Sequence, residues 1–134
     1  MTVSLADLGK GHEFAETRFE LSREWVAQYR AAVEDESGDP SDAPPLSLAT
    51  LSIRALLQEA ALPSGAIHVS QEMSFSLGSQ SSDVVVARAR VASRGERAGW
   101  VLMAIELEAE DEAGMPLMSG RATITFPAAA EGVR

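Results

Sequence analysis

The sequence predicts an α+β domain in which one antiparallel sheet of five strands curls around one long hydrophobic helix. Two observations favour this class. Residues 46–62 are apolar on nearly every side and carry only Arg54 and Glu59 as charges, which is typical of a buried helix. The second half of the chain alternates apolar and polar residues with period two between short polar segments, which is typical of strands.

Length and composition indicate one globular domain spanning residues 1–134, with its core at about residues 13–127. The 134 residues fall within the usual size of a single domain. Hydrophobic residues make up 46% and charged residues 23% of the chain, which are near globular averages, so we do not expect a disordered chain. We expect residues 128–134 to form a frayed tail.

Composition also excludes several classes of protein. With no cysteine and only two histidines, disulfide frameworks, thiolate metal sites, cysteine nucleophiles and histidine-rich metal sites are excluded, so we expect no metal. A formal net charge of −9 argues against a nucleic-acid or membrane partner, because both require a basic patch. No apolar run reaches the roughly 18–20 residues of a membrane span, and residues 1–10 do not resemble a signal peptide. We therefore expect a cytoplasmic protein.

The first quarter of the chain predicts a strand followed by an amphipathic helix. After a short lead-in, residues 13–21 alternate apolar and charged side chains, which predicts the first strand. Ser22 is a good N-cap, and Trp25 and Tyr29 begin an apolar pattern at helical spacing. This pattern predicts a helix over residues 22–34.

A long polar loop separates this helix from the hydrophobic one. Residues 34–45 are rich in Asp, Ser, Gly and Pro, and loops of this length are often functional or disordered. The hydrophobic helix is expected over residues 46–62, because residues 63–65 (Pro-Ser-Gly) end it.

Four further strands are predicted in the remainder of the chain, with polar turns at residues 78–82, 94–99 and 111–114. The strands are expected at residues 66–77, 83–93, 100–110 and 115–126, arranged as a consecutive antiparallel meander. One helix cannot cover both faces of such a sheet. We therefore expect the outer face or an edge strand to pair with a second copy, giving a homodimer or a higher oligomer.

Three stretches carry a resemblance to a known family. Residues 19–37 resemble its first strand, helix and loop start; residues 43–46 (Ala-Pro-Pro-Leu) resemble its step into the central helix. Residues 67–75 (Ile-His-Val-Ser-Gln-Glu-Met-Ser-Phe) resemble the strand that follows. In this order the stretches resemble the hotdog fold of the MaoC-like dehydratase and enoyl hydratase group, over about residues 10–127. The resemblance implies no cofactor, and an acyl thioester of coenzyme A or of a carrier protein as the ligand.

The resemblance also implies where an active site would lie. Catalytic members carry an aspartate and a histidine after the first helix, in a pattern like Gly-Asp-x-Asn-Pro-x-His, and both act at the thioester substrate. Asp35 falls at the aspartate position, whereas the histidine position falls at or near Pro40. No histidine occurs between His12 and His68, so the usual pair lacks one member and hydratase activity is an open question.

Each candidate catalytic residue also has a structural interpretation. Asp35 is either a turn-forming residue of a solvated acidic loop or an acid/base. His68 is either a strand histidine bonded to a backbone carbonyl or a substitute for the missing histidine. Period two places His68 on the polar face with Ser70 and Glu72, and Glu72 lies about 13 Å from it along the strand. His68 and Glu72 therefore cannot share one water within a subunit.

Four residues are candidates for substrate binding. Ser47 is interpreted as the N-cap of the hydrophobic helix, and together with Leu48 it marks a helix start whose backbone amides could polarise a thioester carbonyl. Arg88 and Arg90 share one face of a predicted strand. They are either solvated or contacts for the phosphates of coenzyme A.

Three functions therefore stay open. The first is a hydratase or dehydratase that adds or removes water across an enoyl thioester, with Asp35 and His68 as its catalytic residues. The second is a catalytically inactive hotdog subunit that shapes an acyl tunnel for a second hotdog partner. The third is an acyl-CoA thioesterase in which Asp35 or Glu72 activates a hydrolytic water.

Overall fold

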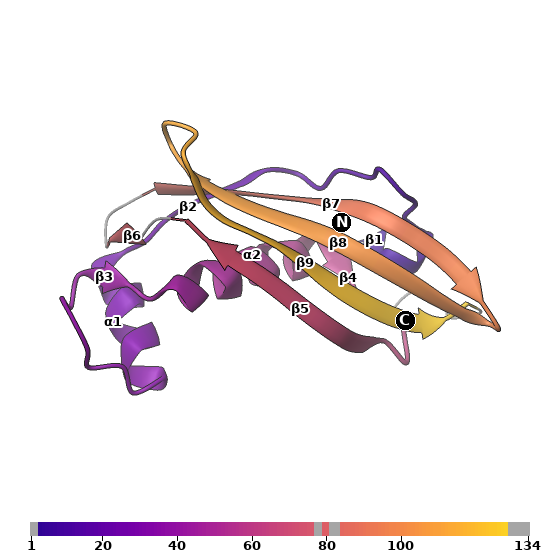
Figure 1. Ribbon diagram of the computed structural model, residues 1–134, viewed down its shortest axis with the longest axis horizontal. Coiled ribbons are helices and arrows are strands. Elements are labelled where there is room, and N and C mark those ends of the chain that lie inside the picture. The colour runs from indigo at the N-terminus through magenta and orange to yellow at the C-terminus, as the bar shows by residue number, and fades with distance from the viewer. Residues whose placement is uncertain (1–2, 77–78, 81–83, 129–134) are drawn as a thin grey trace.

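A five-stranded antiparallel sheet curves along one side of a central helix (Figure 1). The computed structural model describes residues 3–76, 79–80 and 84–128. The strand order is β2-β7-β8-β9-β5. These strands are β2 (Thr17–Glu20), β5 (Ile67–Phe75), β7 (Val84–Arg97), β8 (Trp100–Asp111) and β9 (Pro116–Pro127). The prediction of a five-stranded antiparallel sheet with one central helix is confirmed.

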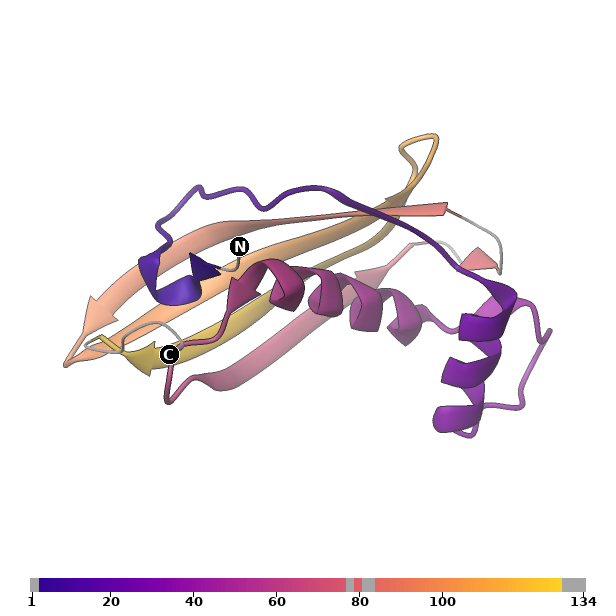
Figure 2. The ribbon, with the colours of Figure 1, turned by 180° about the vertical axis from the view of Figure 1, so that it is seen from behind.

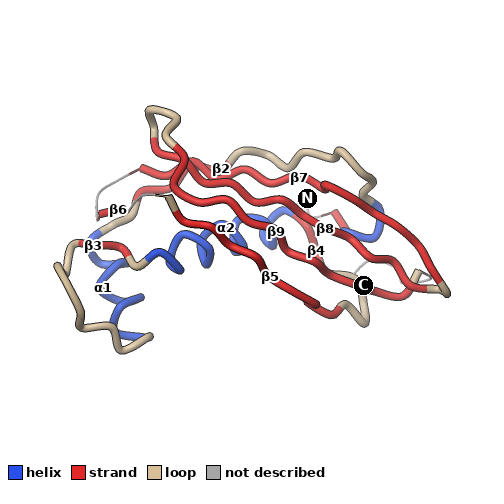
Figure 3. The backbone as a smooth tube through the Cα atoms, in the orientation of Figure 1, coloured by secondary structure: helices blue, strands red, loops and turns tan. Residues whose placement is uncertain are grey.

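Two helices and several short elements complete the fold. Helix α1 (Arg23–Ala32) lies beyond one end of the sheet, whereas α2 (Pro45–Glu59) runs along the sheet (Figures 2 and 3). Outside the main sheet, β1 (Val3–Ser4) pairs with β4 (Ala60–Ala61), and β3 (Asp42–Ala43) pairs with β6 (Ser79–Gln80). A 3₁₀ turn, η1 (Leu5–Asp7), follows β1. No helix in the described ranges is long and apolar enough to cross a membrane.

Helix α1 begins as the sequence predicts. The Ser22 side chain accepts a hydrogen bond from the backbone N–H of Trp25 at 3.1 Å, which confirms Ser22 as the N-cap. The helix ends at Ala32, two residues before the predicted end, and Glu34 adopts a left-handed backbone conformation with φ of 56°. This conformation turns the chain away from the helix axis and starts the polar loop.

Helix α2 is buried on one side only. Leu48 and Leu56 lie in the core against the sheet, with Ser52 between them on the same buried side. The opposite side is open, since Leu46 is 60% exposed and Leu57 is 43% exposed. The expectation of burial on nearly every side is therefore wrong for the isolated chain, because the sheet covers only one side of the helix.

The order of the strands differs from the predicted meander. Strands β7, β8 and β9 follow one another as antiparallel hairpins, but β5 pairs with β9 instead of with β7. The edge of β7 is occupied by β2, which pairs with it antiparallel. The chain therefore crosses from the edge strand β5 to β7, which lies next to the opposite edge strand β2.

The β7–β8 hairpin is tighter than the predicted turn over residues 94–99. Ala98 and Gly99 both have positive φ, 53° and 83°, and alone form the turn, as the twist of a two-residue hairpin requires. Arg94 belongs to β7, and its guanidinium donates to the backbone carbonyls of Ala6 and Leu8 at 2.9 and 3.0 Å. Arg94, one of the polar residues that predict a long turn, thus binds the N-terminal segment instead.

The two faces of the sheet differ in chemistry. The face toward α2 is apolar and forms the core with the helix; its fully buried side chains include Val85, Val91, Val101, Met103, Ile105, Leu107, Met118 and Phe126. The opposite face carries Arg88, Arg90, Glu106 and Glu108. Most of the frayed tail predicted at residues 128–134, and most of the turn predicted at 78–82, lie outside the described residues.

Candidate functional site

Asp35 lies in the loop between α1 and β3, directly after the C-terminal end of α1. Figures 1 and 2 show α1 and this loop beyond one end of α2, and β3 leads from the loop into the helix. The backbone N–H of Asp35 donates to the Arg30 carbonyl at 2.9 Å. This bond anchors Asp35 to the last turn of α1.

The carboxylate of Asp35 is held by Ser37. The backbone N–H and the hydroxyl of Ser37 both donate to Oδ1 of Asp35, at 2.9 and 2.6 Å. These two hydrogen bonds, with a smaller contribution from the positive charge of Arg30, lower the pKa of the Asp35 carboxyl below its ordinary value. Asp35 is therefore a carboxylate at neutral pH, as an ordinary aspartate is, and its lowered pKa makes it a weaker base than a free aspartate.

An open cavity lies against this part of the loop. Its volume is about 720 Å³, and it is lined by Ala27, Arg30, Ala31, Glu34, Asp35, Glu36 and Pro40. The side chain of Asp35 is 26% exposed, so the carboxylate is reachable from the cavity while its Oδ1 stays bonded to Ser37. The cavity thus combines a helix surface with a reachable carboxylate.

Helix α2 begins without a side-chain cap. Pro44 occupies the N-cap position and Pro45 the first helical position, so the first free backbone N–H is that of Leu46. The expectation that Ser47 is the N-cap is wrong, because its hydroxyl and its N–H both point back to the Pro44 carbonyl. Ser47 and Leu48 are fully buried, and Leu48 belongs to the core.

A β-bulge places His68 on the face opposite to the predicted one. The pairing of β5 with β9 shifts between His68 and Ser70, so that His68 lies opposite Ile124 and Ser70 opposite Thr123. His68 consequently shares the inner face of the sheet with Gln71, and its Nε2 lies 3.1 Å from the Gln71 Oε1. The prediction that His68 shares a face with Ser70 and Glu72 is wrong, because an extra residue reverses the alternation.

One chain does not bring Asp35 and His68 together. His68 is the second residue of β5, which starts beyond the C-terminal end of α2, whereas the loop that contains Asp35 lies beyond the N-terminal end of α2 (Figure 1). A helix of 15 residues is about 22 Å long. His12 also lies far from Asp35 along the fold, since its carbonyl accepts from the N–H of Val91 in the second half of β7.

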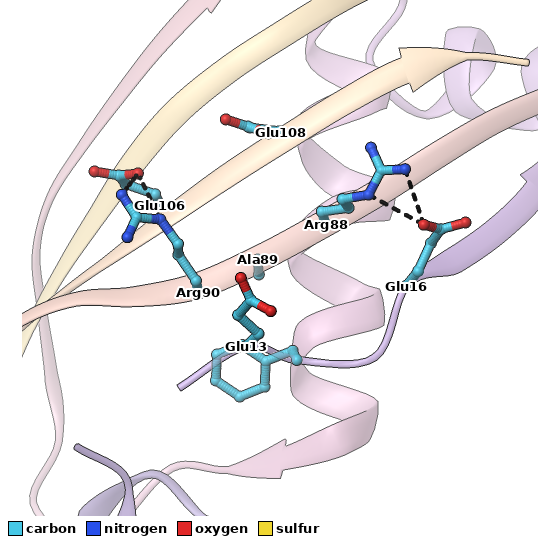
Figure 4. Close-up of a pocket in the computed structure, with 8 residues that line it drawn as sticks. Glu13, Glu16, Arg88, Ala89, Arg90, Glu106 and Glu108 are labelled. Carbon is cyan, nitrogen blue, oxygen red and sulfur yellow. Dashed lines mark hydrogen bonds and ion pairs between the residues drawn. The ribbon is translucent and has the colours of Figure 1, made fainter. Parts of the chain in front are cut away.

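Arg88 and Arg90 are paired with glutamates on the outer face. Arg88 binds Glu16 at 2.9 Å, and Arg90 binds Glu106 at 2.8 Å (Figure 4). Arg88 also binds Glu110. The hydrogen bond that Arg88 donates to the Glu110 carboxylate is the main reason that the pKa of Arg88 is raised. A cavity of about 460 Å³ lies between these groups, lined by Glu13, Phe14, Glu16, Arg88, Ala89, Arg90, Glu106 and Glu108.

Sequence reasoning did not single out Arg30 or Ser37. A signal for Ser37 is nevertheless present in the sequence. The pattern Asp-x-Ser, which is typical of Asp-initiated turns, occurs twice in this loop, at Asp35 and at Asp39. Both aspartates use Oδ1 to accept from the serine two residues later. Arg30 gives no such signal, because a helix arginine looks solvated until the loop folds over it.

Comparison with known proteins gives the fold. No family model matches the chain, and no curated protein matches it. The (R)-hydratase PhaJ1 from Pseudomonas aeruginosa, in its unliganded form, superposes with a TM-score of 0.79 at 16% identity, over 99% of this chain and 91% of that one. The HadBC (3R)-hydroxyacyl-ACP dehydratase complex from Mycobacterium tuberculosis gives 0.73 at 19% identity, over 91% and 100%.

A MaoC-like dehydratase from Rhodospirillum rubrum gives a TM-score of 0.73 at 14% identity, over 98% of this chain and 99% of that one. These identities are low, but the coverage is nearly complete on both sides. The strand order and the central helix agree with the resemblance in the sequence. The chain therefore has the hotdog fold of the MaoC-like dehydratases.

Proposed function

We propose that this protein binds acyl thioesters and adds or removes water across an enoyl thioester, with Asp35 as its acid/base. The observation that supports this most directly is the reachable Asp35 carboxylate in a cavity between α1 and the loop that follows it. The hotdog fold of the MaoC-like dehydratases supports the same class of substrate.

In the proposed hydration, Asp35 takes a proton from a water whose oxygen bonds to the β carbon of the enoyl group. The α carbon takes up a proton, so that one water is consumed in total. The thioester oxygen carries negative charge in between, and the free N–H of Leu46 at the start of α2 is the proposed donor to it. His68 of a second copy is the proposed second group, because His68 of the same chain is at the wrong end of α2.

The thioester is proposed to be carried by coenzyme A or by a carrier protein. Arg88 and Arg90 are proposed contacts for its phosphates. Each of them already binds glutamates, so a phosphate would have to replace a carboxylate partner at each arginine. This exchange limits what the two arginines would contribute to affinity.

We propose a homodimer that forms through the free edge of β5. Ile67 and Val69 are each 54% exposed on this edge strand, and the open side of α2 adds Leu46 and Leu57. The outer face of the sheet is instead covered by ion pairs around Arg88. An apolar edge is therefore a better contact than the outer face, which was the other alternative from the sequence.

A second candidate is an inactive hotdog subunit that pairs with a catalytic hotdog chain. It is favoured by one observation: both histidines of the chain, His12 and His68, lie away from the Asp35 loop. The partner would then supply the complete pair of catalytic groups. In this case the cavity beside Asp35 would shape an acyl tunnel without performing chemistry.

Loss of the double-bond absorbance of crotonyl-CoA tests these candidates, with thiol release measured in parallel. The proposed hydratase is expected to consume crotonyl-CoA without releasing thiol, and Asp35→Asn is expected to lose about 10²–10⁴-fold in rate. Asp39→Asn is the matched control, because Asp39 forms the same turn with Ser41 and should keep the wild-type rate.

Other outcomes separate the alternatives. Thiol release that depends on Asp35 would indicate a thioesterase. If the wild-type protein performs neither reaction but restores activity to a second hotdog chain with which it co-purifies, it is the inactive subunit.

A further inference from the structure

Arg30 is a buried arginine whose guanidinium faces the Asp35 loop. The residue is 9% exposed, although it lies in the last turn of a helix at the end of the molecule. Its Nη1 donates to the Asp42 carbonyl at 3.2 Å, and its Nη2 donates to the Ser37 carbonyl. Burial of a guanidinium is unfavourable unless such acceptors surround it, so the loop and Arg30 stabilise each other.

A chain of contacts leads from Arg30 to the Asp35 carboxylate. Arg30 holds the carbonyl of Ser37, and the N–H and hydroxyl of the same Ser37 donate to Oδ1 of Asp35. The other carboxylate oxygen, Oδ2, lies 3.9 Å from Nη1 of Arg30. Both oxygens of Asp35 are thus oriented by groups whose own positions depend on Arg30.

We infer that Arg30 is a positioning residue that acts through Ser37 to fix the orientation and the negative charge of the Asp35 carboxylate. Its role in catalysis rests on the function proposed above. The forked guanidinium is needed because one group must reach two carbonyls, from Ser37 and Asp42, while it stays next to a carboxylate.

The charged groups around Asp35 come from three elements. Arg30 belongs to α1, Glu34 and Glu36 flank Asp35 in the loop and line the same cavity, and Asp42 belongs to β3. Partial desolvation of the carboxylate raises the pKa of Asp35. The two donors of Ser37, with a smaller effect from the charge of Arg30, act in the opposite direction, and the pKa of Asp35 is lowered as a result.

A second aspartate in the loop, Asp39, serves as a control for the effect of Arg30 on Asp35. Asp39 accepts from the N–H and hydroxyl of Ser41 at 2.9 Å each, in the same turn as Asp35 and Ser37. In the described part of the chain, however, the guanidinium of Arg30 donates to the carbonyl of Ser37 and not to that of Ser41. Loss of Arg30 should therefore affect Asp35 more than Asp39.

Titration of the aspartate carboxyl carbons by NMR tests the inference without any need for turnover. Arg30→Met is expected to raise the pKa of Asp35 and to move that of Asp39 less. Ser37→Ala is expected to raise the pKa of Asp35 alone, and Ser37→Thr, which keeps the hydroxyl, is expected to restore it. Ser37 is exposed, so both of its variants should fold even if Arg30→Met does not.

The variant Arg30→Lys distinguishes the effect of the planar guanidinium geometry from the effect of the positive charge. A lysine keeps the positive charge but cannot reproduce the planar fork, so Asp35 should titrate between its wild-type and Arg30→Met values. If Arg30→Lys behaves as wild type, or if Asp35 titrates unchanged in Ser37→Ala, the inference is wrong.

Kinetics then tests the catalytic role. In an active wild-type protein, Ser37→Ala is expected to lower kcat about tenfold with KM nearly unchanged, and to move the acid limb of the pH–rate profile to higher pH. An inactive wild-type protein would refute the proposed function but leave the titration as a valid test of Arg30. An unchanged kcat in Ser37→Ala, with a shifted titration, would confine Arg30 to a structural role.

Discussion

Arg90 of β7 and Glu106 of β8 lie directly opposite each other on the outer face of the sheet, and Nη2 of Arg90 donates to Oε2 of Glu106 at 2.8 Å. This pair is the centre of a row that crosses five chain segments. Glu13 is paired in register with Arg90, Glu106 with Arg121, and Arg121 with Glu72. Charges of opposite sign thus alternate across the row, and such a face is compatible with solvent.

The first prediction concerns the pH dependence of stability. Hydrogen bonds from Arg90, and to a lesser extent from Arg121, lower the pKa of Glu106 below its ordinary value of 4.5. Glu106 therefore binds a proton more readily in the unfolded chain than in the folded one. The stabilisation from its ion pairs is complete above about pH 4.5, and it is lost as the pH falls through the folded-state pKa of Glu106. Glu106→Gln should cost less than about 1 kcal/mol at pH 7, and this cost should shrink as the pH falls through the folded-state pKa of Glu106, measured by urea unfolding.

Glu108→Gln is the control for this prediction. Glu108 lies two residues along the same strand and forms no ion pair with any described residue. An equal loss of stability at pH 7 in both variants would show that the Arg90–Glu106 pair contributes nothing specific.

The second prediction concerns the contact between β9 and the edge strand β5. A Cβ added at Gly120 would lie 2.5 Å from the Glu72 carbonyl oxygen and would also overlap the Met73 sulfur. Because backbone cannot move aside easily, Gly120→Ala should destabilise the protein by about 1–3 kcal/mol. Gly95→Ala should be nearly neutral, since a Cβ at that position meets nothing within 4 Å.

Thermal unfolding followed by circular dichroism checks both glycine variants. Equal melting temperatures for Gly120→Ala and wild type would show that β5 shifts away from β9 without cost.

The third prediction compares two buried serines of α2. The Ser52 hydroxyl is buried and has no hydrogen-bond partner among the described residues, whereas the Ser47 hydroxyl donates to the Pro44 carbonyl. Ser52→Ala should therefore stabilise the protein by about 1 kcal/mol, and Ser47→Ala should destabilise it by a similar amount. Denaturant midpoints measure both changes. A loss of stability in Ser52→Ala would show that its hydroxyl is satisfied in solution.

The fourth prediction concerns assembly. Val69→Lys places a charge on the free edge of β5, and lysines on edge strands prevent pairing with another chain. The proposed homodimer should dissociate into monomers, as measured by size-exclusion chromatography with light scattering. Leu102→Lys is the control, because Leu102 is equally exposed but lies in the inner strand β8. A dimer that survives Val69→Lys, or one that is lost in Leu102→Lys, would place the contact elsewhere.

Local signals in the sequence predicted the elements well. The Ser22 cap, the start of α2 after the double proline and the alternation of β8 depend on neighbouring residues, and each appears within two residues of its predicted bounds. Asp35 was singled out by the resemblance to the MaoC-like group, and the local signal of a turn-forming aspartate predicted the turn that it forms with Ser37.

Long-range pairing decided what these signals could not. The place of β5 beside β9, and the bulge that turns His68 to the inner face, depend on hydrogen bonds between segments about 50 residues apart. One inserted residue reverses every side chain beyond it, and period two carries no information about where such an insertion occurs.

By itself, the sequence determined the α+β class, the capped first helix and the amphipathic strands, since each depends on contacts between residues close along the chain. Only the tertiary structure decided that Arg30 is buried under the Asp35 loop and that both histidines lie at the other end of α2. The physical reason is that burial and electrostatic pairing depend on which segments, distant in the sequence, come into contact. The local pattern of apolar and polar residues does not specify those contacts.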